Sequence, residues 1–132
     1  MDSGIVIFWE WVDNRNRGVM SEALADLEKA QRIKVEERLD RIEELKTLSH
    51  ESIKPWADNF SGPLKKIKIH GNVQVRPILV VGPIDKESEI TFLLVAFEKD
   101  RKLIPANAAE IAEERLDQIL KDPRRRRIYD RD

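Results

Sequence analysis

Basic and polar side chains recur at alternate positions in two short runs near the middle of the chain: Lys66, Lys68, Gln74 and Arg76. The residues between them are apolar, and successive side chains of a β-strand point to opposite faces of its sheet. The pattern predicts two strands with a buried apolar face and a basic face. We take the basic face as the candidate site, because a local cluster of cations can attract phosphate. The alternative is that it is only the solvated face of a sheet.

The turn between the two runs, residues 70–72, must have a length that keeps these faces separate. A three-residue loop pairs Ile69 with Val73. In the same register Lys66 pairs with Arg76, whereas a loop of two or four residues would set apolar residues against polar ones. The sequence therefore predicts a β-hairpin closed by an odd-numbered loop.

The rest of the pattern predicts further strands and helices around this hairpin. Residues 4–12 are rich in β-branched and aromatic types, and residues 90–97 are almost wholly apolar, so both are predicted as buried strands. Residues 21–48 have the helical period and form either one long helix or, with a break near residues 28–31, a helical hairpin. A last helix is predicted over residues 107–122, and the proline that follows at position 123 ends it.

Residues 122–132 are predicted to be a basic C-terminal tail. They contain four consecutive arginines: Arg124, Arg125, Arg126 and Arg127. A chain end is mobile unless contacts hold it, and clustered arginines can bind phosphate. The tail could therefore either grip phosphate or serve only to keep the protein in solution.

Length and composition limit the classes of function. The chain of 132 residues suits one domain, residues 1–132. It has no cysteine and two histidines, so we expect no metal centre and a cytoplasmic protein. No apolar run approaches the roughly 20 residues that a membrane span needs. The 24 basic and 25 acidic side chains leave a net charge of -1, so binding of nucleic acid would have to come from local patches.

The order of the predicted elements and three of their segments follow a known pattern. Residues 64–69 form a basic strand, and residues 75–79 form a strand that contains an arginine. A Phe-x-Lys motif at residues 97–99 is followed by Pro105 and by an acidic helix that includes residues 110–115. Together these features resemble the RelE/ParE superfamily of toxins from bacterial and phage toxin–antitoxin modules, and within it the HigB-like branch. The resemblance covers nearly the whole chain.

This resemblance implies a fold class and an activity. The fold would be α+β, a small RelE-like domain with a curved, mostly antiparallel sheet of about four strands, an N-terminal helical hairpin or long helical region, and a C-terminal helix. The activity would be ribosome-dependent, metal-independent cleavage of mRNA, which inhibits translation. Carried over by position, the catalytic residues would be Lys66, Lys68, Arg76 and Lys99. The residues expected to bind RNA are Lys65, Gln74, Arg124, Arg125, Arg126 and Arg127.

The basic face would suit that chemistry. Cleavage of RNA through its 2′-hydroxyl needs a base, an acid and stabilisation of the charge that develops at phosphorus. A lysine can act as the base only where neighbouring cations lower its pKa, and the predicted face places several cations together. Arg76 would hold the phosphate, since its guanidinium stays charged and matches phosphate geometry.

The resemblance also implies partners. We expect a cognate antitoxin of helix-turn-helix type, and the ribosome with its mRNA, and we expect neither a cofactor nor a membrane. The alternative is a non-catalytic member of the superfamily that acts by binding protein. Such a protein would be a ParE-like inhibitor of a topoisomerase or an adaptor encoded by a phage or mobile element.

Overall fold

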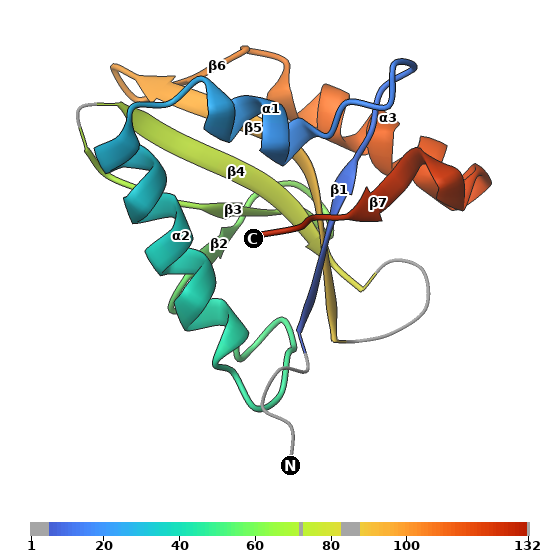
Figure 1. The fold of residues 1–132 in the computed structure, drawn as a ribbon, viewed down its shortest axis with the longest axis horizontal. Helices are drawn as coiled ribbons and strands as arrows, with labels where there is room; N and C mark the ends of the chain where they lie inside the picture. The colour runs from blue at the N-terminus through green and yellow to red at the C-terminus, as the bar shows by residue number, and fades with distance from the viewer. Residues whose placement is uncertain (1–5, 72, 83–87, 132) are drawn as a thin grey trace.

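The computed structural model describes residues 6–71, 73–82 and 88–131. Figure 1 shows how helices and strands are arranged along these residues. In chain order the elements are β1 (Ile7–Trp11), α1 (Val19–Ala25), α2 (Lys29–Glu43), β2 (Ala57–Asn59), β3 (Lys65–Ile67), β4 (Gln74–Val81), β5 (Glu89–Lys99), β6 (Lys102–Ile104), α3 (Ala108–Lys121), the 3-10 helix η1 (Pro123–Arg125) and β7 (Arg126–Ile128).

The seven strands of the described chain form one mixed sheet. Its order is β2-β3-β4-β5-β1-β7, and β6 pairs with β5 outside this path. β1 is parallel to β5, whereas all the other neighbouring strands are antiparallel. The first eight residues of β5 are buried, which confirms the prediction that this strand is covered on both faces.

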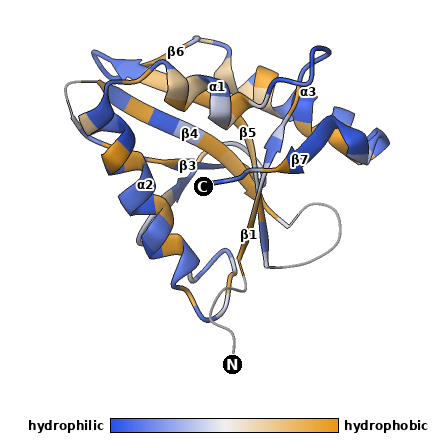
Figure 2. Cartoon of the chain, viewed as in Figure 1, coloured by the Kyte–Doolittle hydropathy of each residue, from blue (hydrophilic) through white to orange (hydrophobic). Residues whose placement is uncertain are grey.

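The sheet separates two apolar cores. On one face α1 and α2 contribute buried side chains to the first core: Met20, Leu24, Val35, Leu39 and Ile42. On the other face α3 contributes Ala108, Ala112 and Ile119 to the second core. Figure 2 shows the hydrophobic residues of β4 and β5 between these layers, and the mixture of hydrophilic and hydrophobic residues on α2. The helices therefore bury one side each, while the central strands are buried on both.

The predicted fold class is wrong. The sheet has seven strands rather than about four, and it is mixed. The N-terminal helical segment forms neither one long helix nor a long hairpin, because α1 has only seven residues and ends before the 15-residue α2 begins. Figure 1 shows α1 lying along the top of the sheet while α2 runs down beside it. Each helix packs mainly on the sheet, and Leu27 in the link between them packs against the same core.

The predicted hairpin between β3 and β4 has the right parity and the wrong register. Ile69 pairs with Val75 rather than with Val73. The strands are therefore shifted by two residues from the prediction. A shift of two keeps the alternation of faces, so Lys66 and Arg76 still share a face although they are not paired.

Side chains stabilise the wider connection that results. Gln74 Nε2 donates a hydrogen bond of 3.3 Å to the carbonyl of Gly71, and His70 Nδ1 lies 3.0 Å from Gln74 Oε1. Val73, which the prediction placed in the core, is 42% exposed. The remaining residue of the predicted turn, Asn72, lies outside the described residues. The sequence pattern could not include these local hydrogen bonds, which decide the register.

Residues 122–131 do not form the predicted free tail. They continue through η1 into β7, which pairs with β1 as an edge strand. Beyond it the Tyr129 ring is buried in the first core, and Arg131 bonds to Glu36 and Glu43 of α2. Three of its arginines, Arg126, Arg127 and Arg131, therefore have acidic partners elsewhere in the fold, which hold the segment against the sheet and α2. Asp132 lies outside the described residues.

Candidate functional site

A row of hydrogen-bonded polar side chains crosses β4 and β5 at the end of the sheet next to the β3–β4 connection. In the β4–β5 register Gln74 pairs with Glu98, and Arg76 lies two residues along on the same face. Arg76 Nε donates to Glu98 Oε1 at 3.0 Å, and Arg76 Nη2 donates to Gln74 Oε1 at 3.0 Å. Gln74 Oε1 also contacts His70 Nδ1 at 3.0 Å. We call these four residues, His70, Gln74, Arg76 and Glu98, the polar row.

The hydrogen bonds of the polar row fix the tautomer of His70. The side-chain amide of Gln74 is oriented by its neighbours, because its nitrogen donates to Gly71 and its oxygen accepts from Arg76. An amide oxygen can only accept, so the bond from His70 Nδ1 requires a proton on that nitrogen. The exposed imidazole therefore has its other nitrogen, Nε2, available to accept a proton in the neutral form and to donate one in the imidazolium form.

Arg76 is an internal member of the row. It is 2% exposed, and its Nη1 donates to the carbonyls of Ile69 and Val75. Burial of a cation is tolerated where its donors are satisfied and a carboxylate faces it, which Glu98 provides. The prediction that the Arg76 side chain faces the surface is therefore wrong. The residue instead positions the two side chains on either side of it.

The predicted catalytic lysines do not form one cluster with Arg76. Lys66 Nζ lies 5.3 Å from the ring centroid of Phe60, and Lys68 Nζ forms an ion pair of 2.9 Å with Asp58. Lys68 shares the face of the polar row and is half-exposed, so it can approach a ligand there. Lys99 ends β5 and pairs with Lys102 of β6, and alternation points its side chain to the opposite face from Glu98.

The residues predicted to bind RNA are also dispersed. Lys65 is buried and donates to Asn59 at 2.7 Å, while Gln74 belongs to the polar row. The four arginines have separate environments: Arg124 is exposed beside Asp122, Arg125 faces Trp11, Arg126 is buried against Glu89 and Thr91, and Arg127 bonds to Glu10. The structure therefore does not present them as one phosphate-binding surface.

Two residues of the polar row were missing from the predicted site. The sequence pattern predicts His70 only as a turn residue, and Glu98 only as the middle residue of the Phe-x-Lys motif. A signal for Glu98 existed in the alternation of β5, since it falls on the same face as Ala96 and opposite Gln74. The position of His70 depends on the wider loop and could not be read from periodicity.

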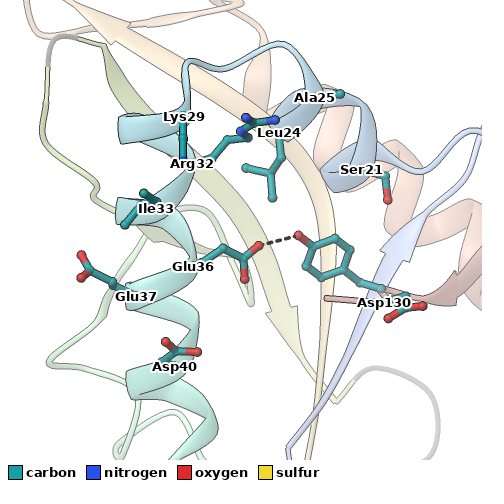
Figure 3. Close-up of a pocket in the computed structure, with 11 residues that line it drawn as sticks. Ser21, Leu24, Ala25, Lys29, Arg32, Ile33, Glu36, Glu37, Asp40 and Asp130 are labelled. Atoms are coloured by element: carbon teal, nitrogen blue, oxygen red, sulfur yellow. Dashed lines mark hydrogen bonds between the residues drawn. The ribbon is translucent and has the colours of Figure 1, made fainter. Parts of the chain in front are cut away.

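A pocket of about 570 Å³ lies on the opposite side of the sheet, between α1, α2 and the segment after β7. Figure 3 shows the side chains of α2 that line it, and its dashed line marks a hydrogen bond to Glu36. The phenol of Tyr129 donates a hydrogen bond to Glu36 Oε2. That bond is 3.0 Å long. Burial, together with the negative charge of Glu36, raises the pKa of the Tyr129 phenol, which therefore stays a donor. This pocket contains no part of the polar row.

The chain matches no family model, and no curated protein or solved structure matches it either. Within the described ranges, no group of three or more metal-binding side chains is placed to hold a metal ion. None of the helices in the described part of the chain is long and apolar enough to cross a membrane.

Proposed function

We propose that this protein is the toxin of a type II toxin–antitoxin module and that it cleaves mRNA by metal-independent acid–base chemistry at the polar row. The observation that carries the proposal is the hydrogen-bonded sequence His70–Gln74–Arg76–Glu98, which has an imidazole at one end and a carboxylate at the other. The resemblance of the sequence to the RelE/ParE superfamily supports the same function. The ribosome and a helix-turn-helix antitoxin are the partners that belong to this proposal.

The proposed step uses the two ends of the polar row. Glu98 takes the proton of a ribose 2′-hydroxyl while the 2′-oxygen forms a bond to the neighbouring phosphorus. The bond from phosphorus to the 5′-oxygen breaks, and the imidazolium form of His70, which carries a proton on both ring nitrogens, gives its Nε2 proton to that oxygen and becomes the neutral Nδ1–H tautomer. The products are a 2′,3′-cyclic phosphate and a 5′-hydroxyl. Charge on the phosphate oxygens would be met by Lys68, which is half-exposed on the same face.

Arg76 has a positioning role in this proposal. Its hydrogen bonds hold one oxygen of Glu98 and the amide of Gln74, which in turn contacts His70. No hydrogen bond to the other oxygen of Glu98 is found among the described residues, and the Glu98 side chain is 26% exposed. Glu98 Oε2 is therefore the atom that we assign to the proton of the 2′-hydroxyl.

The test is cleavage of a defined mRNA in the presence and absence of ribosomes, with the ends mapped by primer extension. His70→Ala and Glu98→Gln should each reduce the rate by about 100-fold or more, which is the usual contribution of one acid or base. Lys99→Ala, on the opposite face, is the matched control and should change the rate little. Cleavage that persists at the wild-type rate in both row variants would reject the proposal.

A second candidate function is inhibition through protein binding without cleavage. The observation in its favour is the burial of Arg76, because an arginine that serves only the fold needs no substrate. Under this alternative, growth inhibition by the induced protein would survive His70→Ala and Glu98→Gln. A topoisomerase pulled down with these variants would then identify the ParE-like mode.

A further inference from the structure

A second groove adjoins the polar row on the outer side of α2. It has a volume of about 590 Å³ and is lined by Lys34, Glu37, Arg38, Asp40, Arg41, Glu44, Trp56, Ile69 and His70. His70 belongs both to this groove and to the polar row, where its Nδ1 contacts Gln74. A ligand in the groove would therefore end beside the imidazole.

Trp56 differs from the other tryptophans in how its ring is covered. Trp9 and Trp11 each have a guanidinium carbon 3.9 Å from the ring centroid. For Trp56 the guanidinium carbon of Arg38 lies 5.5 Å away, and its buried indole Nε1, like that of Trp9, has no hydrogen-bond partner among the described residues. Its coverage by the guanidinium is therefore looser, and it has an unsatisfied donor at its edge.

Two cations of the groove are placed to meet an anion. Lys34, Arg38 and Arg41 are spaced so that they lie along one side of α2. Among the described residues neither Lys34 nor Arg38 forms an ion pair. The formal charge of the lining is balanced, since three basic side chains face three acidic ones, Glu37, Asp40 and Glu44. Asp40 is bonded by Arg131 from outside the groove, and Arg41 lies 3.6 Å from Glu44. Lys34 and Arg38 are therefore the cations of the groove that are placed to meet a phosphate.

A groove that combines such cations with an aromatic wall has the chemistry that binds single-stranded nucleic acid, in which phosphates meet cations and bases stack on rings. We propose that this groove binds the nucleotide of a single-stranded RNA that adjoins the cleaved phosphate, with its base on Trp56 and its phosphate at Lys34 and Arg38. The inference rests on the proposed function, because the RNA substrate defines the ligand.

Binding is measured by fluorescence anisotropy with a labelled 2′-O-methyl oligoribonucleotide of mixed sequence, which cannot be cleaved through its 2′-oxygen. Trp56→Leu should weaken binding by about tenfold or more, whereas Trp56→Phe, which keeps a ring, should weaken it much less. Lys34→Ala and Arg38→Ala should also weaken binding. Arg32→Ala is the matched control, because Arg32 is an exposed cation of the same helix that lines the pocket on the other side.

The outcomes separate this inference from the proposed function. If RNA binding depends on Trp56, Lys34 and Arg38, the inference about the groove is supported, even where unmodified RNA is not cleaved. In that case only the proposed cleavage is rejected. If cleavage depends on His70 but Trp56→Leu leaves RNA binding unchanged, only the inference about the groove is rejected. Equal losses in Arg32→Ala and Arg38→Ala overturn it as well, because they indicate only general attraction. Unchanged circular dichroism is required of every variant compared.

Discussion

Arg76 of β4 donates a hydrogen bond of 3.0 Å from its Nε to Oε1 of Glu98 on β5. The arginine side chain is 3% exposed and the glutamate side chain 26%, so the pair joins the inside of the sheet to its surface. The same guanidinium also satisfies the carbonyls of Ile69 and Val75, which are the residues that pair at the end of the hairpin. Arg76 thus supports the register of β3 and β4 and the geometry of the proposed site together.

Arg76→Ala should lower the free energy of unfolding by about 2 kcal/mol or more, because it leaves the Glu98 carboxylate without its donor and removes second hydrogen bonds from the carbonyls of Ile69 and Val75. Urea denaturation followed by circular dichroism measures this change. Lys99→Ala, which removes an exposed cation of the neighbouring strand, should change stability by less than about 0.5 kcal/mol. Equal stability of the two variants would show that Arg76 does not hold the hairpin.

Gly18→Ala should destabilise the protein by about 2 kcal/mol or more. A Cβ at Gly18 would overlap the carboxylate of Glu10, which caps α1 by accepting from the amides of Met20 and Ser21. Either the carboxylate moves and leaves those donors unpaired, or α1 shifts on the sheet. Thermal unfolding compares the two proteins.

Gly62→Ala is the control for the change at Gly18. Gly62 has a φ of +55°, and no atom of the described residues lies within 4 Å of the position of an added Cβ, so the cost of the substitution is limited to backbone strain of about 1 kcal/mol. Gly18 has no positive φ, and its cost is steric. A smaller loss at Gly18 than at Gly62 would contradict the capping role of Glu10.

Tyr129→Phe should cost about 1 kcal/mol near pH 8, because the phenol donates to the Glu36 carboxylate. The pKa of Tyr129 is raised in the folded protein above its ordinary value of 10.0. The contribution of the protonated phenol is therefore complete below pH 10 and is lost as the pH rises above it. Urea midpoints from pH 8 to 11 should show the gap between wild type and Tyr129→Phe closing, and a constant gap would contradict the linkage.

Lys68→Ala should reduce RNA cleavage by about tenfold with little loss of stability, because its ion pair with Asp58 is half-exposed. Asp58→Asn should not reduce cleavage, since it removes the competing carboxylate and frees the ammonium for phosphate. Single-turnover rates on the same mRNA measure both. Equal loss of rate in the two variants would indicate that the ion pair matters only for the fold.

Some of this architecture is determined locally and could be predicted. The apolar run of β5 requires burial on both faces, and the alternation in β3 and β4 places Lys66, Lys68, Gln74 and Arg76 on one side. The parity of the hairpin followed from the same alternation. The register did not, because a shift of two residues leaves every face unchanged and only contacts within the loop distinguish the alternatives.

What only the tertiary structure decided is the environment of each charge. Four consecutive arginines predict a basic tail, yet Arg126 is buried beside Glu89, which is 37 residues away in the sequence, and Arg127 bonds to Glu10, which is 117 residues away. The same holds for Arg76, whose partner Glu98 comes from another strand. The sequence by itself determined which faces carry charge, because side-chain alternation is a local property of the backbone. Whether a cation is free to bind phosphate or is neutralised inside the fold depends on residues distant in the chain, which only the packing of the sheet brings together.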